Sequence, residues 1–250
     1  MKKLLCLFVL FCVILSVGCA VDSAPTVETF EQDTTQPTTE PTTEATEPTT
    51  LPTENNEEPP KMASYVVEYT SVKMQRDSVG NSWLNVIVTV KNTGEEAIRL
   101  TDGTIAAFAD DEQVLLIENA TCYPNILRPG EIGYYFEQDP TYVEDGRELR
   151  VEFGANMERA SADNAQFIVE DSQVYDAAFG VEVRGAFSES VQGIVCAAVL
   201  FDMEQKPFAV LYEYFDEMTN EFTLSSDKLP EGLSKEDVAS HIVYVYRYES

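Results

Sequence analysis

Short stretches in which every second residue is apolar follow one another along the last three quarters of the chain. In "WLNVIVTVKN", Leu84, Val86, Val88 and Val90 alternate with other residues, which is the period-two pattern of a strand with one buried face. Gly, Pro, Asn and Asp separate such stretches, as in the turn "RPGE" at 128–131. No long stretch has the helical period. The pattern therefore predicts an all-β protein.

The predicted strands fall into two groups of similar size. About seven short strands come first, a number typical of a small β-sandwich. The stretch 156–165, "NMERASADNA", interrupts the pattern, which then restarts. Ser234, as N-cap, and Asp237, in the reciprocal capping position, predict one helical turn before the last strand, "HIVYVYRY". We expect two tandem β-sandwich modules, residues 61–155 and 165–250, each near the smallest size that is stable alone. A single larger sandwich is the alternative.

The two groups of predicted strands share a short sequence motif. "AAFADDEQ" (106–113) and "AAVLFDMEQ" (197–205) both begin with two alanines, pass through apolar residues and end in Asp-x-Glu-Gln. Small residues at the end of a core strand let two sheets approach closely, and the acidic end suits an exposed hairpin. The spacings differ by one residue, as a bulge or a loop change would produce. The sequence therefore favours an internal duplication.

The first residues have the form of a secretory signal. Lys2 and Lys3 precede an apolar stretch, residues 4–15, that is short for a membrane span. The ending "LSVGC" resembles the lipobox of bacterial lipoproteins, in which cleavage makes the cysteine the lipidated N-terminus. We therefore expect a signal peptide over residues 1–18 and lipidation of Cys19. Its acyl chains, palmitate among them, would anchor the protein on the extracytoplasmic face of a bacterial cell membrane. An ordinary cleaved signal is the alternative.

A tether follows the predicted anchor. Residues 19–60 are dominated by Thr, Pro and Glu, and their one aromatic residue is Phe30. Such a segment has too little apolar surface to offset the entropy of ordering, so we expect it to be disordered. Proline and like charges extend it toward the polyproline limit, which gives a reach of about 120 Å. This length suits a spacer between a membrane and an exported domain.

The composition limits the partners. The chain has 16 Lys+Arg and 44 Asp+Glu, a net charge of −28, so it repels the phosphates of nucleic acids, and we expect no nucleic-acid partner. Its acidic surface favours cations and basic surfaces. Cys122 and Cys196, one in each predicted module, are expected to be buried free thiols, although a disulfide between the modules stays open.

Candidate catalytic and metal-binding residues are few. His241 is the one histidine, and it opens an apolar strand, so we predict no catalytic residue and no zinc site. The clusters Asp110–Glu112 and Glu144–Asp145 offer oxygen ligands for calcium but lack the EF-hand spacing. We therefore predict no metal and no cofactor. Two carboxylates could still converge across a loop, as in a glycoside hydrolase.

Tyrosines alternate in two of the predicted strands. Strands that present the same face would form one aromatic surface able to stack on sugar rings or to hold a peptide. Tyrosines that lie opposite one another also stabilise a sheet without any ligand. The predicted ligand-binding residues are Tyr212, Tyr214, Tyr244, Tyr246 and Tyr248.

The second group of strands resembles the FxLYD-type modules of bacterial surface lipoproteins. "VEVRGAFSES" is similar to their first strand and polar break, and "LFD" (200–202) is similar to their Leu-Tyr-Asp, with Phe201 in place of Tyr and Ala198 in place of the leading Phe. In the first group, "VTVKNTGEEAIRL" and "LRPGEIGYYF" are similar to turns of related Ig-like modules. The resemblance implies Ig-like sandwiches on a surface lipoprotein, without catalytic residues.

These observations predict a non-enzymatic, lipid-anchored cell-surface protein. Its Ig-like modules would bind a protein or glycan ligand for adhesion, ligand capture or envelope assembly. One alternative is an envelope hydrolase that uses paired carboxylates, and another is an accessory subunit of a transporter, secretion or sensor complex.

Overall fold

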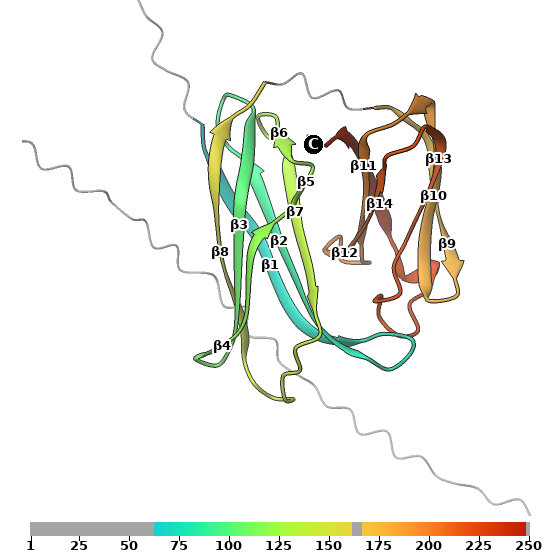
Figure 1. Ribbon diagram of the computed structural model, residues 1–250. Helices are drawn as coiled ribbons and strands as arrows, with labels where there is room; N and C mark the ends of the chain where they lie inside the picture. The colour runs from blue at the N-terminus through green and yellow to red at the C-terminus, as the bar shows by residue number, and fades with distance from the viewer. Residues whose placement is uncertain (1–62, 162–166, 249–250) are drawn as a thin grey trace, which may run out of the picture. The chain divides into compact units, whose positions relative to one another are not determined.

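The computed structural model describes residues 63–161 and 167–248, which belong to one compact unit. The predicted signal peptide, Cys19 and the predicted tether lie outside these residues. Within the described ranges the chain forms fourteen β-strands and a single 3-10 turn, with no α-helix (Figure 1). This confirms the all-β prediction. No helix in the described ranges is long and apolar enough to cross a membrane.

The first eight strands form two antiparallel sheets. Sheet A has the order β1–β2–β7–β5, and sheet B is centred on β3, which pairs with β4, β6 and β8. The strands are β1 (Tyr65–Arg76), β2 (Ser82–Asn92), β3 (Ile98–Ala109), β4 (Glu112–Ala120), β5 (Cys122–Tyr123), β6 (Ile126–Leu127), β7 (Ile132–Asp139) and β8 (Leu149–Arg159).

The remaining six strands form two more antiparallel sheets. Sheet C has the order β12–β11–β14, and sheet D has the order β13–β10–β9. The strands are β9 (Val169–Ala177), β10 (Gly180–Val191), β11 (Ile194–Phe201), β12 (Pro207–Phe215), β13 (Thr219–Ser225) and β14 (Ser240–Arg247). Each pairing among the described strands joins two members of β1–β8 or two members of β9–β14.

One detail corrects the sequence analysis. Residues 156–165 were expected to interrupt the strands, but β8 continues to Arg159 because it pairs with β3 as far as Ile98. Strand β3 is long because it continues past a bulge in its backbone between Thr101 and Thr104. Asp102, inside this bulge, has a positive φ of 49°. A short polar residue tolerates that conformation better than most, so the strand passes through the bulge without ending.

Alternation along β2 builds the first core. Leu84, Val86, Val88 and Val90 all have 0 % exposure and pack with residues of sheet B, including Ile105. This is the buried face that the period-two pattern predicts. At roughly 1.5–3 kcal/mol for each large aliphatic side chain, the face contributes much of the free energy of this core.

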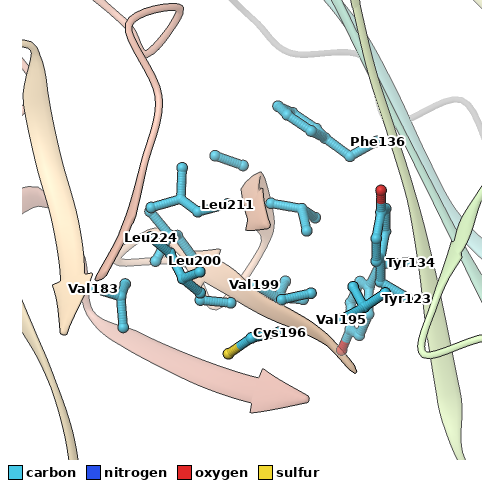
Figure 2. Close-up of a cluster of buried hydrophobic side chains, with 14 of the residues drawn as sticks. Tyr123, Tyr134, Phe136, Val183, Val195, Cys196, Val199, Leu200, Leu211 and Leu224 are labelled. Atoms are coloured by element: carbon cyan, nitrogen blue, oxygen red, sulfur yellow. The ribbon is translucent and has the colours of Figure 1, made fainter. Parts of the chain in front are cut away.

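The second core extends from sheets C and D to sheet A. On β2, Ile87 points away from sheet B, and it belongs to the same buried cluster as β11. Figure 2 shows Tyr134 and Phe136 of β7 on the side of sheet A that faces β11, and they belong to the same buried cluster as Val195 and Val199. The two groups of strands therefore share a continuous apolar cluster. Their expected division into two modules at residues 155–165 stays a prediction.

Polar contacts add to this shared cluster. The carbonyl oxygen of Lys228, in the loop after β13, accepts hydrogen bonds from Nε2 of Gln75 (2.9 Å) and Nε2 of Gln138 (3.0 Å). The Lys228 ammonium lies 4.6 Å from the centroid of the Trp83 ring. The loop after β13 is thus linked to sheet A by two hydrogen bonds and a cation–π contact.

Asp77 fixes the hairpin between β1 and β2. Its carboxylate accepts hydrogen bonds from Nε1 of Trp83 (2.9 Å), Nδ2 of Asn81 (2.8 Å) and the backbone N–H of Val79 (3.0 Å). Burial of Asp77 opposes its ionisation, but these hydrogen bonds outweigh that effect and lower its pKa to about 2. The charged form of Asp77 therefore holds Trp83 in place beneath Lys228.

The predicted capping turn is present. The 3-10 turn Lys235–Asp237 follows Ser234, whose backbone N–H and hydroxyl donate to Oδ2 of Asp237 at 2.9 and 2.8 Å. These hydrogen bonds lower the pKa of Asp237.

Candidate functional site

The register of sheet C brings the predicted tyrosines onto one face. In the sheet, Tyr212 and Tyr244 flank Ala197 of β11, and Tyr214 and Tyr246 flank Val195. Residues in register on neighbouring strands share a face. Tyr248 follows the end of β14, and its ring centroid lies 5.6 Å from that of Tyr214. We call these five residues the tyrosine face.

Sheet A covers part of the tyrosine face. Tyr123 stacks on Tyr212 with ring centroids 5.0 Å apart, and the Tyr134 ring lies 6.1 Å from the Tyr244 ring. Tyr246 is 3 % exposed. Burial raises the pKa of Tyr123, Tyr244 and Tyr246. The covered tyrosines therefore serve as packing between sheets A and C.

Two members of the tyrosine face reach the surface. Tyr212 is 44 % exposed and Tyr214 is 45 % exposed, with their ring centroids 6.1 Å apart. Exposed aromatic rings anchored in a rigid sheet are a common basis of recognition. The role in ligand binding stays a prediction, and solvent reaches the rings at the Tyr212–Tyr214 end of the face.

A groove of about 580 Å³ lies beside Tyr212. This volume is in the usual range of small-ligand sites. Phe179, in the turn between β9 and β10, is 46 % exposed at the groove. Glu182, Asp227 and Lys228 add charge to its wall, and Phe136, Val181, Val210 and Leu211 add apolar surface. The sequence analysis missed this groove because its residues come from five separate strands and the loops beside them.

Ser172 and His241 lie close together across the second group of strands. Ser172 Oγ is 2.9 Å from Nε2 of His241, and burial lowers the pKa of the imidazole. A nucleophilic site of the serine–histidine type also needs a carboxylate to orient the histidine. Among the described residues, the imidazole of His241 has the hydroxyl of Ser172 as its hydrogen-bond partner. This pair therefore bridges β9 and β14.

The acidic cluster Asp110–Glu112 meets an arginine. Nε of Arg147 donates to Asp110 and Nη1 donates to Glu112, both at 3.0 Å. The backbone N–H of Glu148 and the Arg147 guanidinium lower the pKa of Asp110. The guanidinium thus occupies the position that a cation would take between these carboxylates. Among the described residues, no three His, Cys, Asp or Glu side chains come together as a metal site would require.

Both cysteines of the described chain are buried free thiols, as expected. Cys122 lies in the core between sheets A and B, and Cys196 lies in the core that β11 shares with sheet D. Burial raises the pKa of Cys122 to about 12 and also raises that of Cys196. Because each thiol packs in a different core, the two do not form a disulfide.

The fold and these surfaces define a class of protein, an all-β chain of antiparallel sheets with a partly exposed aromatic face. The chain matches no family model, no curated protein and no solved structure.

Proposed function

We propose that the protein is a non-enzymatic, lipid-anchored protein of a bacterial cell surface that captures a protein or glycan ligand. The observation that carries this proposal is the pair Tyr212 and Tyr214. Both rings are nearly half exposed, although Tyr212 also stacks on Tyr123 of sheet A and the neighbouring Tyr244 and Tyr246 are largely covered. A groove of ligand size adjoins Tyr212. Rings held by packing on one side lose little entropy when a ligand covers the other side.

The turn after β11 supports the proposed likeness to FxLYD-type, Ig-like modules. Asp202 ends the Leu-Phe-Asp motif, and its Oδ1 accepts the backbone N–H groups of Glu204 and Lys206, both at 2.9 Å. An aspartate at this position closes the hairpin, while Leu200 and Phe201 enter the core. The motif thus has a structural role that a family of such modules would share.

The anchor is tested by replacing the predicted lipid attachment site. The full chain and its Cys19→Ala variant are expressed in a bacterium fed with labelled palmitate, with the buried Cys122→Ala variant as the matched control. We expect Cys19→Ala to lose the label and to leave the membrane fraction, whereas Cys122→Ala retains both. A Cys19→Ala chain that stays labelled and membrane-bound would contradict the anchor.

Ligand capture is tested on the exposed tyrosines. Binding of the purified full chain to isolated cell envelopes is compared for the wild type, Tyr212→Ala/Tyr214→Ala and Tyr142→Ala. Tyr142 is a suitable control because it is 64 % exposed and lies on the loop between β7 and β8. We expect the double variant alone to lose binding. Equal binding by all three proteins would refute a role of the tyrosines.

A further inference from the structure

The outer edge of β12 has unpaired backbone groups. β12 is an edge strand of sheet C, and β11 is its neighbour in that sheet. The carbonyl oxygen of Phe215 accepts the N–H of Gly193, next to β11, at 2.7 Å, so it points toward β11. In an antiparallel pair, alternate residues direct both backbone groups to the partner strand. The N–H and C=O groups of Val210, Tyr212 and Tyr214 therefore point away from β11.

Other parts of the edges of sheet C are protected. β12 begins at Pro207, and its pairing with β11 bulges next to this residue. The carbonyl oxygen of Phe208 accepts Nδ2 of Asn85 at 3.4 Å. On the opposite edge, Val245 of β14 accepts the N–H of Phe167 at 3.2 Å. Proline, bulges and covering segments are the usual means by which proteins protect an edge. Val210 and Leu211 are 2 % and 1 % exposed, so neighbouring segments cover that part of β12 as well. The exposed residues Tyr212–Tyr214 have none of these protections in the described part of the chain.

The side chains beside this open edge differ between the two faces of β12. Tyr212 and Tyr214 lie on one face, and Glu213, which is exposed, lies on the other. The 580 Å³ groove adjoins β12 at Val210–Tyr212, and its charged residues are the acidic Glu182 and Asp227 and the basic Lys228. A strand added here would place alternate side chains against tyrosine rings and against a carboxylate.

We propose that the exposed 212–214 edge of β12 binds an extended basic segment of another protein by strand addition. The segment alternates apolar or aromatic residues, which meet Tyr212 and Tyr214, with Lys or Arg, which meet Glu213. Backbone hydrogen bonds to the edge provide affinity, and the alternating side chains provide specificity. This inference rests on the proposed function, because it names the ligand class for the same surface.

Charge decides between this partner and a second copy of the chain. Each copy has a net charge of −28, so pairing two β12 edges would bring two strongly acidic molecules together. A basic segment is instead attracted to the surface before it docks. The occupant is therefore a cationic strand from another protein.

The experiment uses synthetic peptides and the purified full chain. The probe has nine residues, the length of β12, and alternates lysine with valine and tyrosine. One control replaces each lysine with glutamate, and a second carries N-methyl groups on the backbone nitrogens that would donate to β12. We expect the probe to bind in calorimetry at low salt. The N-methylated peptide should bind at least about tenfold more weakly, since each lost hydrogen bond lowers the affinity severalfold. The glutamate peptide should not bind.

Variants of the chain locate the site. Glu213→Lys should weaken the probe about fivefold to tenfold, because like charges then oppose one another across the pair. Glu236→Lys, an equal charge change at an exposed position of the 3-10 turn, should leave the affinity unchanged. Tyr214→Pro removes an N–H that points outward from β12, so it should weaken binding severalfold without breaking the ladder to β11. The fluorescence of Trp83 reports that each variant is folded.

Two results would overturn strand addition. One is equal affinity for the probe and its N-methylated form, and the other is equal weakening by Glu213→Lys and Glu236→Lys, which would indicate non-specific attraction. Concentration-dependent dimers that Glu213→Lys strengthens would assign the edge to a second copy. Failure here leaves the proposed function separately testable, because envelope binding that depends on the tyrosines would still show ligand capture by another mode.

Discussion

The hairpins β3–β4 and β11–β12 carry nearly the same sequence motif, but they differ in how many of its residues are buried. Along β3 buried and more exposed residues alternate from Ile105 to Ala109, whereas all eight residues of β11 are buried. The outer face of β3 meets solvent, while β11 lies between sheet A and sheet D. A strand covered on both faces can be apolar throughout. The motif therefore specifies a strand and its turn, and the surrounding sheets determine how many faces of the strand are buried.

The turns of the two hairpins are also held differently. Asp202 accepts two backbone N–H groups of its own hairpin, from Glu204 and Lys206. Asp110, with a positive φ of 52°, accepts the N–H of Glu148, just before β8, and the guanidinium of Arg147. One turn is thus closed by local bonds, and the other depends on a segment distant in sequence.

The largest expected difference comes from truncating one apolar residue in each strand. Leu200→Ala removes a side chain with 0 % exposure in the shared core and should lower the free energy of unfolding by about 2–5 kcal/mol. Phe108→Ala removes a ring that packs under Arg150 on the outer face of β3 and should cost about 1 kcal/mol or less. Urea unfolding measures both values. A greater loss for Phe108→Ala would contradict the two-sided burial of β11.

Enlarging the alanines tests the same comparison in the opposite direction. Ala197, between Tyr212 and Tyr244, has 0 % exposure, so Ala197→Leu overpacks the contact with sheet A and should destabilise the protein by about 1–3 kcal/mol. Ala106 lies opposite Leu116 on the outer face of β3, and Ala106→Leu should change stability by less than about 0.5 kcal/mol. Similar effects of the two substitutions on stability would show that sheet A does not pack closely against β11.

The sequence predicts the local features of this molecule well. Period-two alternation identifies β2 and its buried face, and Ser234 and Asp237 form the expected cap. The shared sequence motif correctly predicts two hairpins with exposed acidic turns. Each of these features depends on residues that are neighbours in the chain, whose spacing directly shows the period or the turn.

The features that the sequence could not predict depend on contacts between distant segments. Tyr212 and Tyr244 share a face because both strands pair with β11, and Tyr123 covers Tyr212 because sheet A packs there. Alternation assigns a residue to a face, but it does not say what lies above that face. For the same reason, the continuous apolar run of β11 was the one available sign that both of its faces are buried.

The turns should respond differently to salt. Asp202→Ala removes two local hydrogen bonds and should cost about 1 kcal/mol at both low and high salt. Asp110→Ala removes the acceptor of the Glu148 N–H and also an exposed ion pair with Arg147, so its effect should shrink as salt screens that pair. Thermal unfolding in about 0.02 M and about 0.5 M NaCl separates the two. Equal salt dependence would indicate that Arg147 does not contribute to the Asp110 turn.

The smallest expected effect is the pH dependence of the Asp110 turn. Hydrogen bonding from Glu148 and the charge of Arg147 lower the pKa of Asp110 below its ordinary value of 3.8, so the native state favours the ionised carboxylate. The stabilisation is therefore fully present above pH 3.8 and is lost as the pH falls through the lowered pKa. The difference in stability between the wild type and Asp110→Asn, followed by urea unfolding, should close over that range. In an Arg147→Gln background the difference should shrink but persist, because the backbone N–H of Glu148 is the larger cause. If the stability difference disappeared completely in the Arg147→Gln background, the lowered pKa of Asp110 would be due to the ion pair instead.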